Sequence, residues 1–212
     1  SDVYKRQEQD GLAERSQKLA GAAWEQGWFA DEVVSVEVPG RKGPTIVAKD
    51  EHLRPDSTVE KMKKLKPVFK DGGTVHAGNS SGVTDGAAAI VVAGAKAAEA
   101  KGMTPFARVV DWAVAGVDPA VMGLGPVPAT QKLLEKTGLS LSDIDLIELN
   151  EAFAAQVTAC DRELGFDMSR VNVHGGSIAL GHPIGATGCR IAVTLLHAMK
   201  RTGAKRGLAT LC

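Results

Sequence analysis

After Pro105, short strand patterns and short helix patterns alternate along the chain, and proline or glycine separates them. Apolar residues predict strands at 106–114, 144–149 and 207–211. A period of about 3.6 residues predicts helices at 128–136, 153–164 and 186–202. Gly138 and Gly203 stand where two of these helices would end, as glycine often does. This alternation is typical of an α/β protein.

The first hundred residues carry less regular patterns. Residues 8–27 predict a surface helix with Leu12, Leu19 and Ala23 on one side. Residues 32–38 alternate between apolar and polar positions and end at a Pro-Gly turn, which predicts a strand.

Three further segments precede Pro105. The charged stretch 49–70 has few strand signals and is interpreted as a helix with a solvated face. Small residues at 71–82 predict a loop, followed by an alanine-rich helix at 85–101 that Gly102 ends. A loop that enters the start of a helix is a potential anion site.

Charge and apolar content exclude several classes of function. Lys plus Arg equal Asp plus Glu at 25 each, so there is no broad positive field for nucleic acid or an anionic membrane. No apolar run approaches the roughly 18 to 20 residues of a membrane span. The three cysteines lack the spacing of zinc ligands or of a disulfide framework, so reduced thiols and no metal are expected. We expect a soluble protein located in the cytoplasm.

Both ends of the sequence lead us to expect a fragment. The chain begins at Ser1 without methionine, and residues 1–7 carry no apolar period, so they need not be native. It stops at Cys212, inside a predicted strand.

Three residues stand out as candidates for chemistry. Asn150 follows a predicted strand, where it could simply cap the next helix. His182 lies in the glycine-rich segment 175–188, and Pro183 restricts its backbone to extended conformations. Its imidazole could act as a base or donate to an oxyanion, or it could only fit a structural turn. Cys212 follows a strand and could equally be an inert thiol.

Two common enzyme classes fit poorly. Gly181, Gly185 and Gly188 do not have the spacing of a dinucleotide-binding fingerprint, and no acidic residue stands at the expected distance. Ser80 and Ser177 lack the strand-turn-helix setting of a hydrolase nucleophile. A nicotinamide enzyme and a serine hydrolase are therefore disfavoured.

The segments 150–153, 175–188 and 207–212 together resemble three signature segments of the thiolase family, in the family's order and spacing. Residues 78–86 resemble the family's CoA-loop segment. The resemblance implies an enzyme that condenses two acetyl-CoA to acetoacetyl-CoA, or cleaves a 3-oxoacyl-CoA with CoA, through an acyl-cysteine. CoA and acyl-CoA would be substrates, with no further cofactor.

The family resemblance also implies an architecture. The fold would be the layered α/β/α/β/α thiolase fold, incomplete in this chain. Residues 1–80 would belong to the CoA-binding loop domain, 81–104 to the last helical segment of the N-terminal domain, and 105–212 to the C-terminal domain. Intact members are dimers or tetramers, so a homodimer or homotetramer is expected at full length.

The residue roles that follow from the resemblance centre on the same three candidates. Asn150 would hold a water that forms an oxyanion hole with His182, and His182 would help to activate the nucleophile. Cys212 would exchange a proton with the acetyl methyl group, and a thiol suits this because its pKa, near 8.5, is readily lowered in a polar site.

Four residues would bind the substrate. Phe69 and Phe153 would line the pantetheine tunnel. Ser81 would contact CoA, and Arg54 would approach its nucleotide end.

Departures from the family pattern limit what this chain could do alone. The acylated cysteine belongs to the family's first half, and Cys160 and Cys189 are interpreted as helix packing residues instead. The glycine-rich segment that follows the acid/base cysteine is missing, so the fragment should be inactive. His174 stands where many members have asparagine. The alternative is a thiolase-like protein that binds acyl-CoA or lipid without activity.

Overall fold

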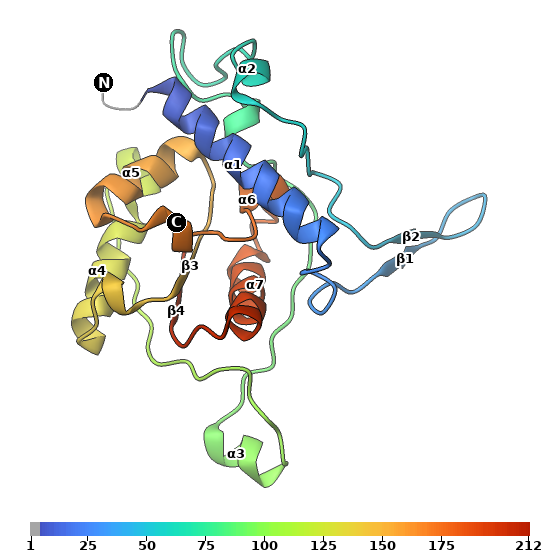
Figure 1. Cartoon of the computed structure of the whole chain (residues 1–212), viewed down its shortest axis with the longest axis vertical. Coiled ribbons are helices and arrows are strands. Elements are labelled where there is room, and N and C mark those ends of the chain that lie inside the picture. Colours follow the sequence, from blue (N-terminus) through green and yellow to red (C-terminus); the bar gives the residue numbers. More distant parts are fainter. Residues whose placement is uncertain (1–4) are drawn as a thin grey trace.

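The computed structural model describes residues 5–212, and Figure 1 shows the order of its elements. The helices are α1 Arg6–Glu25, α2 Val59–Met62, α3 Ala95–Ala100, α4 Pro126–Thr137, α5 Ala154–Leu164, α6 Ser177–Leu180 and α7 Thr187–Thr202. The strands are β1 Val36–Val38, β2 Thr45–Val47, β3 Leu146–Leu149 and β4 Gly207–Thr210. Short 3-10 turns are η1 Ala77–Asn79, η2 Pro119–Leu124, η3 Leu141–Asp143 and η4 Met168–Arg170.

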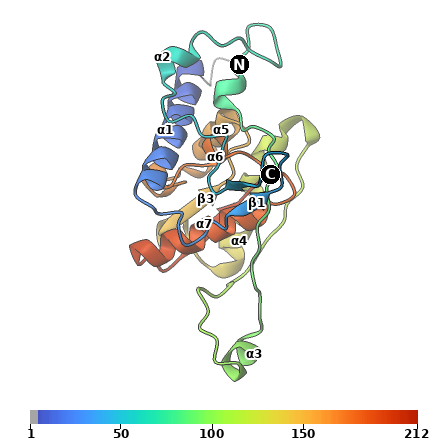
Figure 2. The ribbon, with the colours of Figure 1, turned by 90° about the vertical axis from the view of Figure 1, so that its right-hand side faces the viewer.

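The centre of the molecule is the pair of strands β3 and β4, which run parallel with Leu146 opposite Gly207 and Leu149 opposite Thr210. All four residues of β3 are buried. Helix α7 contacts both strands and α4 contacts β4. Figure 2 shows α4 and α7 in the same part of the molecule as β3. Because every residue of β3 is covered, its sequence is continuously apolar apart from Glu148. The predicted mixed α/β class is confirmed for this part of the chain.

The helices predicted after Pro105 are confirmed, and their ends follow the expected chemistry. Helices α4, α5 and α7 end at Gly138, Gly165 and Gly203, whose φ angles are 67°, 68° and 77°. Glycine adopts this left-handed conformation without the steric cost of a Cβ atom, so each helix stops there.

Helix α1 forms as predicted, but its buried side is not the predicted apolar one. Ala23 is buried, whereas Leu12 and Leu19 are only partly covered. The other buried residues of α1 are Gln9, Asp10, Ala13, Ser16, Gln17, Ala20 and Gly21. Small and polar residues lie inward because α1 packs against α5, α6 and η1 through buried hydrogen bonds. The helix lies at the surface as predicted, with Lys18 and Glu25 exposed, but the side that it buries is mostly small and polar.

The strand predicted at 106–114 is wrong. These residues have no strand geometry, and Val109, Val110 and Trp112 are exposed. A strand needs a neighbouring strand to pair its backbone groups, and none of the described residues supplies one here.

The helix predicted at 85–101 is reduced to α3, which lies apart from the main body in Figure 1. A short alanine-rich segment gains too little from propensity alone when no apolar face packs against the protein. For the same reason the charged stretch 49–70 contains only the single turn α2.

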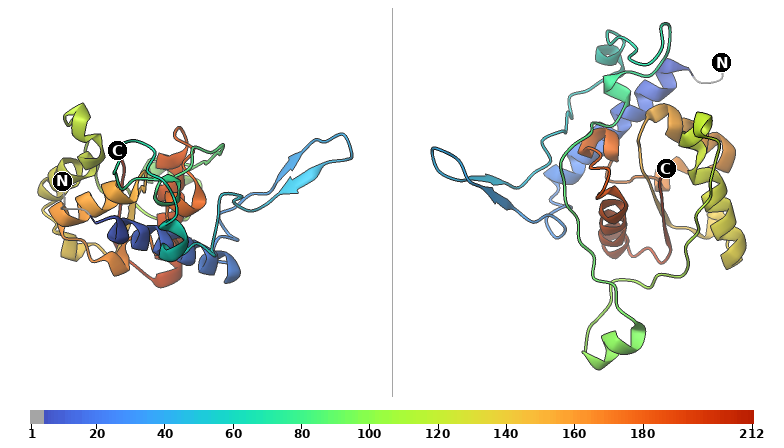
Figure 3. Two further views of the ribbon diagram at one scale, coloured as in Figure 1. Left: turned by 90° about the horizontal axis from the view of Figure 1, so that it is seen from above. Right: turned by 180° about the vertical axis from the view of Figure 1, so that it is seen from behind.

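The predicted strand at 32–38 is shortened to β1, which pairs antiparallel with β2. Val36 lies opposite Val47, and the hairpin extends away from the body in Figure 3. None of its residues is buried.

Two predictions concern the chain as a whole. The segment 1–7 falls partly outside the described residues, but Arg6 belongs to α1 and donates hydrogen bonds of 2.7 Å to the carbonyls of Met62 and Leu65. Among residues 5–212, no helix combines the length and the apolar character that crossing a membrane requires.

Candidate active site

The carboxyl ends of β3 and β4 bring two of the predicted site residues to one edge. Asn150 follows β3, and its backbone N–H donates to the carbonyl oxygen of Thr210 at 3.0 Å. Cys212 lies two residues beyond Thr210. Because parallel strands end on the same side of a sheet, functional groups gather at this edge.

The side chain of Asn150 does not cap the following helix. Helix α5 has Phe153 at its N-cap and no side-chain cap hydrogen bond. Instead, Asn150 Oδ1 accepts a hydrogen bond of 2.6 Å from Ser177 Oγ, and Asn150 Nδ2 lies 3.5 Å from His182 Nε2. The capping alternative is therefore wrong, and Asn150 and His182 form a pair.

The hydrogen bonds around His182 define which of its ring nitrogens carries the proton. Thr187 donates its single hydroxyl proton to the carbonyl oxygen of Pro183 at 2.9 Å. Thr187 Oγ1, 2.7 Å from His182 Nδ1, must then accept from that nitrogen. His182 Nε2 is left unprotonated and faces Asn150. Burial and the charge of Arg190 lower the pKa of His182, which favours this neutral form.

The loop that carries His182 needs glycine for close packing. Gly181 has a φ angle of 91°, and a Cβ atom there would lie 2.6 Å from Thr84 Oγ1. The next residue, His182, donates its backbone N–H to the carbonyl of Gly82 at 2.8 Å. The left-handed glycine therefore holds the histidine against the 82–84 segment.

Cys212 is exposed, and its thiol makes no hydrogen bond to Asn150 or His182 within the described part of the chain. Its Cβ would lie 3.4 Å from a Cβ placed on Gly125. The protein atoms that crowd the thiol raise its pKa above the ordinary value. Desolvation outweighs the one hydrogen bond that acts in the other direction, and the lowering of this pKa in a polar site stays a prediction.

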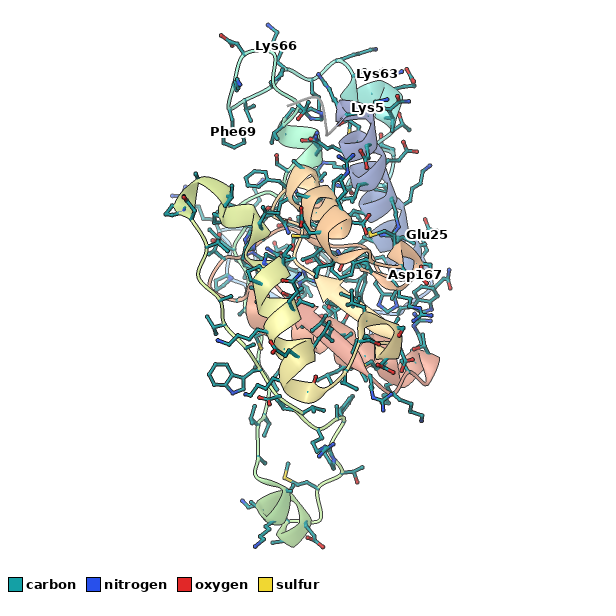
Figure 4. The ribbon with its side chains drawn as sticks, turned by 90° about the vertical axis from the view of Figure 1, so that its left-hand side faces the viewer. Lys5, Glu25, Lys63, Lys66, Phe69 and Asp167 are labelled. Carbon is teal, nitrogen blue, oxygen red and sulfur yellow. The ribbon has the colours of Figure 1, made fainter. Side chains whose placement is uncertain are left out.

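The four predicted binding residues fall into two groups. Phe69 and Phe153 meet edge to face, with ring centroids 5.6 Å apart, and Ser81 Oγ donates to the carbonyl of Ala152 at 3.0 Å. Figure 4 shows Phe69 in the loop at the end of the molecule away from α3. Arg54 is exposed and makes no contact with these residues; its guanidinium donates to the carbonyls of its own loop.

The two other cysteines differ from each other. Cys160 is fully buried in the core beside α4, as expected of a packing residue, and burial raises its pKa to about 11. Cys189 is only partly covered and lines an open cavity of about 390 Å³ formed with Thr84, Asp85 and Pro183. The interpretation of Cys189 as a packing residue stays a prediction. None of the seven predicted site residues lines this cavity.

Two functional residues were missed by the sequence interpretation, Ser177 and Thr187. Ser177 was considered only as a hydrolase nucleophile, although it holds the amide of Asn150. Thr187 holds His182 from the first turn of α7. The spacing of five residues between His182 and Thr187, across Pro183, is the one sequence signal that could have suggested it. Among residues 5–212, no group of three His, Cys, Asp or Glu side chains is arranged to hold a metal ion.

Comparison with known proteins matches this chain to two family models. The model described as thiolase, C-terminal domain, matches residues 103–212, and the model described as thiolase, N-terminal domain, matches residues 3–96. The acetyl-CoA acetyltransferase of Paracoccus denitrificans is 55% identical over 207 residues, which are 98% of this chain and 53% of that protein.

Solved structures give the same result. The acetyl-CoA acetyltransferase of Bacillus anthracis superposes with a TM-score of 0.97 at 50% identity, over 98% of this chain and 53% of that one. The human mitochondrial 3-ketoacyl-CoA thiolase in complex with CoA gives a TM-score of 0.91 at 45% identity, over 98% and 52%. The chain spans about half the length of the relatives that it matches. It belongs to the thiolase family and contains parts of both the N-terminal and the C-terminal thiolase domains.

Proposed function

We propose that this chain supplies Asn150, His182 and Cys212 to the active site of an acyltransferase that acts on CoA thioesters. The observation that carries the proposal is the unprotonated Nε2 of His182 facing Asn150 at the same sheet edge that leads to Cys212. A neutral imidazole with a free ring nitrogen can accept the proton of a nucleophilic thiol.

The proposed reaction is a condensation of two acetyl-CoA to acetoacetyl-CoA, or its reverse with a 3-oxoacyl-CoA. An acetyl group first passes to a cysteine supplied from outside this chain, whose proton goes to His182, and CoA leaves as the thiol with the proton of Cys212. Cys212, now a thiolate, removes a methyl proton from the second acetyl-CoA. The carbanion attacks the acyl-cysteine carbonyl and expels the cysteine thiolate. Both directions are redox-neutral acyl transfers, so atoms and electrons balance without an oxidant or reductant.

Once His182 Nε2 has taken the proton of the nucleophilic thiol, its N–H would stabilise the oxyanion that develops on the thioester carbonyl beside Asn150. The buried amide of Asn150 cannot rotate freely, because Ser177 holds its oxygen at 2.6 Å. Donors that are already oriented need no reorganisation as charge develops, which is where such sites gain most of their effect.

Substrate binding is proposed at the residues near the loop 76–82. Phe69 and Phe153 would border the pantetheine arm, Ser81 would contact CoA, and Arg54 would pair with the anionic nucleotide end. CoA is the molecule bound in the human relative's structure. The finer domain division at 80/81 and 104/105, the five layers and a homodimer or homotetramer are proposed for the whole protein.

A segment exchange tests the proposal. The chain would replace the matching segment of the Paracoccus denitrificans acetyl-CoA acetyltransferase, which is 55% identical. We expect the chimera to cleave acetoacetyl-CoA in the presence of CoA. A folded chimera that binds CoA but cleaves nothing would contradict the enzyme proposal and support the alternative of a thiolase-like binding protein.

Within this chimera, Cys212→Ser separates the two halves of the reaction. We expect the variant to accept a radiolabelled acetyl group from acetyl-CoA but to condense it with a second acetyl-CoA at least about a hundredfold more slowly, because the proton acceptor is gone. Cys160→Ser, a change of the same kind in the core, serves as the control. Unchanged condensation in Cys212→Ser would refute the proton-transfer role.

A further inference from the structure

We propose that Arg190 and Ser177 are positioning residues that fix the orientation of the Asn150 amide and thereby keep the free ring nitrogen of His182 directed at it. The inference concerns the same site as the proposed function and rests on it for its catalytic meaning. The geometry itself can be tested without activity.

The first step is the direction of the hydrogen bonds at Ser177, whose side chain is fully buried. Arg190 Nη2 lies 3.0 Å from Ser177 Oγ, and a guanidinium can only donate. Ser177 has one proton, and with Arg190 occupying an acceptor position that proton goes to Asn150 Oδ1 at 2.6 Å. The amide oxygen must therefore face Ser177.

The second step follows from the shape of an amide. Once Asn150 Oδ1 faces Ser177, the NH₂ group faces His182 Nε2 at 3.5 Å. Without Arg190, the hydroxyl of Ser177 could instead accept from Asn150 after a half-turn of the amide. The amide oxygen would then face Nε2, and the histidine would gain by moving its proton to Nε2, with the Thr187 hydroxyl turned from Pro183 to donate to Nδ1. Arg190 therefore adds to the preference for the Nδ1 tautomer that the hydrogen bond from Thr187 to Pro183 also favours.

The third step concerns what holds Arg190. Its Nη1 lies 3.6 Å from Oε2 of Glu148, whose side chain is almost completely buried. Glu148 lies on β3, two residues before Asn150. The same strand therefore positions both the partner of Arg190 and the Asn150 amide. Burial raises the pKa of Glu148 to about 8 and that of Glu32 to about 7, in spite of the nearby charge of Arg190.

The position of Ser177 is also fixed. Glu151 accepts a hydrogen bond of 2.6 Å from Ser16 Oγ and one of 3.2 Å from the backbone N–H of Ile178, which follows Ser177. A Cβ atom on Gly176 would lie 2.2 Å from the Glu151 carboxyl carbon, so only glycine fits there. The start of α6 is therefore anchored independently of Asn150.

The experiment observes the tautomer of His182 in the 212-residue chain labelled with ¹⁵N-histidine, because the two ring nitrogens have different NMR shifts according to protonation. His182→Gln identifies its signals among those of the five histidines. We expect the form protonated at Nδ1 in the native chain, and a growing share of the Nε2 form in Ser177→Ala and Arg190→Met. Arg190→Lys, which keeps a cationic donor, should restore much of the native signal.

The matched control is Thr158→Ala, which removes another buried hydroxyl whose hydrogen bond stays within α5. It should leave the His182 tautomer unchanged. An unchanged tautomer in folded Ser177→Ala and Arg190→Met would overturn the proposal. An equal shift of the His182 tautomer in Thr158→Ala would also overturn the proposal, because the shift would then follow from the loss of any buried hydroxyl.

Kinetics of the chimera provide the second readout. Ser177→Ala should lower kcat by roughly tenfold to a hundredfold with little change in KM, because the amide is misoriented while CoA still binds. In Arg190→Met, the acid limb of the pH profile should move to higher pH, because the positive charge that lowers the pKa of His182 is gone.

The groups that face Arg190 are Glu148, Glu32, Asp50 and His182. An inactive native chimera with the expected tautomers would defeat the proposed function and leave the positioning intact. A rise in KM with unchanged kcat and pH profile in Ser177→Ala and Arg190→Met would contradict the positioning role of these two residues.

Discussion

His182 and His174 lie in the same glycine-rich region of the chain, each beside an arginine, yet their surroundings differ. His182 is partly covered, and both of its ring nitrogens face polar side chains, Thr187 and Asn150. His174 is buried between Trp28 and Phe29, with ring centroids at 5.1 and 5.8 Å. One setting leaves a ring nitrogen available at a sheet edge, and the other encloses the ring.

The enclosure of His174 has an electrostatic consequence. Its Nε2 accepts a hydrogen bond from Arg201, and among the described residues its Nδ1 has no hydrogen-bond partner. Burial, together with the charge of Arg201, lowers its pKa to about 4. Arg201 also stacks on Trp28 at 3.8 Å. The arginine beside His174 packs against Trp28, whereas the arginine near His182 donates to Ser177 Oγ, which is the contact on which the proposed positioning rests.

The largest expected effect separates the two histidines by activity. In the chimera, His182→Ala should slow thiolysis on the order of a thousandfold, because it removes the proposed base, whose Nε2 donates to the oxyanion once it has taken a proton. His174→Asn should retain most of the activity. Initial rates at saturating acetoacetyl-CoA and CoA measure both, and equal losses would break the distinction between a reactive and an enclosed histidine.

The sequence singled out the setting of His182, because the signals that mark this setting are local. Pro183 next to His182, and the glycines around it, already imply a fixed backbone. The partners of His174 lie far away, on the loop after α1 and near the end of α7, so nothing adjacent to it in the sequence predicted an aromatic enclosure. Family resemblance noted the residue without giving it a role.

The same distinction explains the errors in the fold. Helices that carry their own stop signals, such as α4 before Gly138, were predicted well. The strand expected at 106–114 and the helix expected at 85–101 depend on partners elsewhere, and periodicity does not identify a partner. The buried polar side of α1 was missed because Asp10 and Ser16 are covered through hydrogen bonds to His76 and Glu151, residues distant in sequence.

A smaller effect concerns stability in acid. The pKa of His174 is about 4 in the folded chain and near 6.5 when unfolded, so between these values only the unfolded chain binds this proton. The contribution of neutral His174 to the free energy of unfolding is fully present above pH 6.5. It decreases by up to about 3 kcal/mol as the pH falls toward 4. Urea unfolding of the chain at pH 7 and pH 4.5 measures it.

His174→Asn isolates this contribution. Glu148 and Glu32 have raised pKa values, so they stabilise the fold in acid and act in the opposite direction as the pH rises. Both remain in the variant, and the difference between the native and variant pH dependences therefore belongs to His174. If the free energies of unfolding of the native chain and of His174→Asn change in parallel with pH, the burial of His174 does not lower its pKa.

The smallest expected effect tests whether Arg201 creates the enclosure. Arg201→Met should cost about 1–2 kcal/mol at pH 7, because it removes the stacking on Trp28 and the hydrogen bond to His174. It should also make the loss of stability in acid shallower, since the charge that helps to lower the pKa of His174 is gone. Lys200→Met removes the same charge from the neighbouring residue of α7, whose ammonium lies over Phe106 instead. If both variants flatten the acid dependence equally, the effect is one of net charge, and the contact between Arg201 and His174 does not distinguish this histidine from His182.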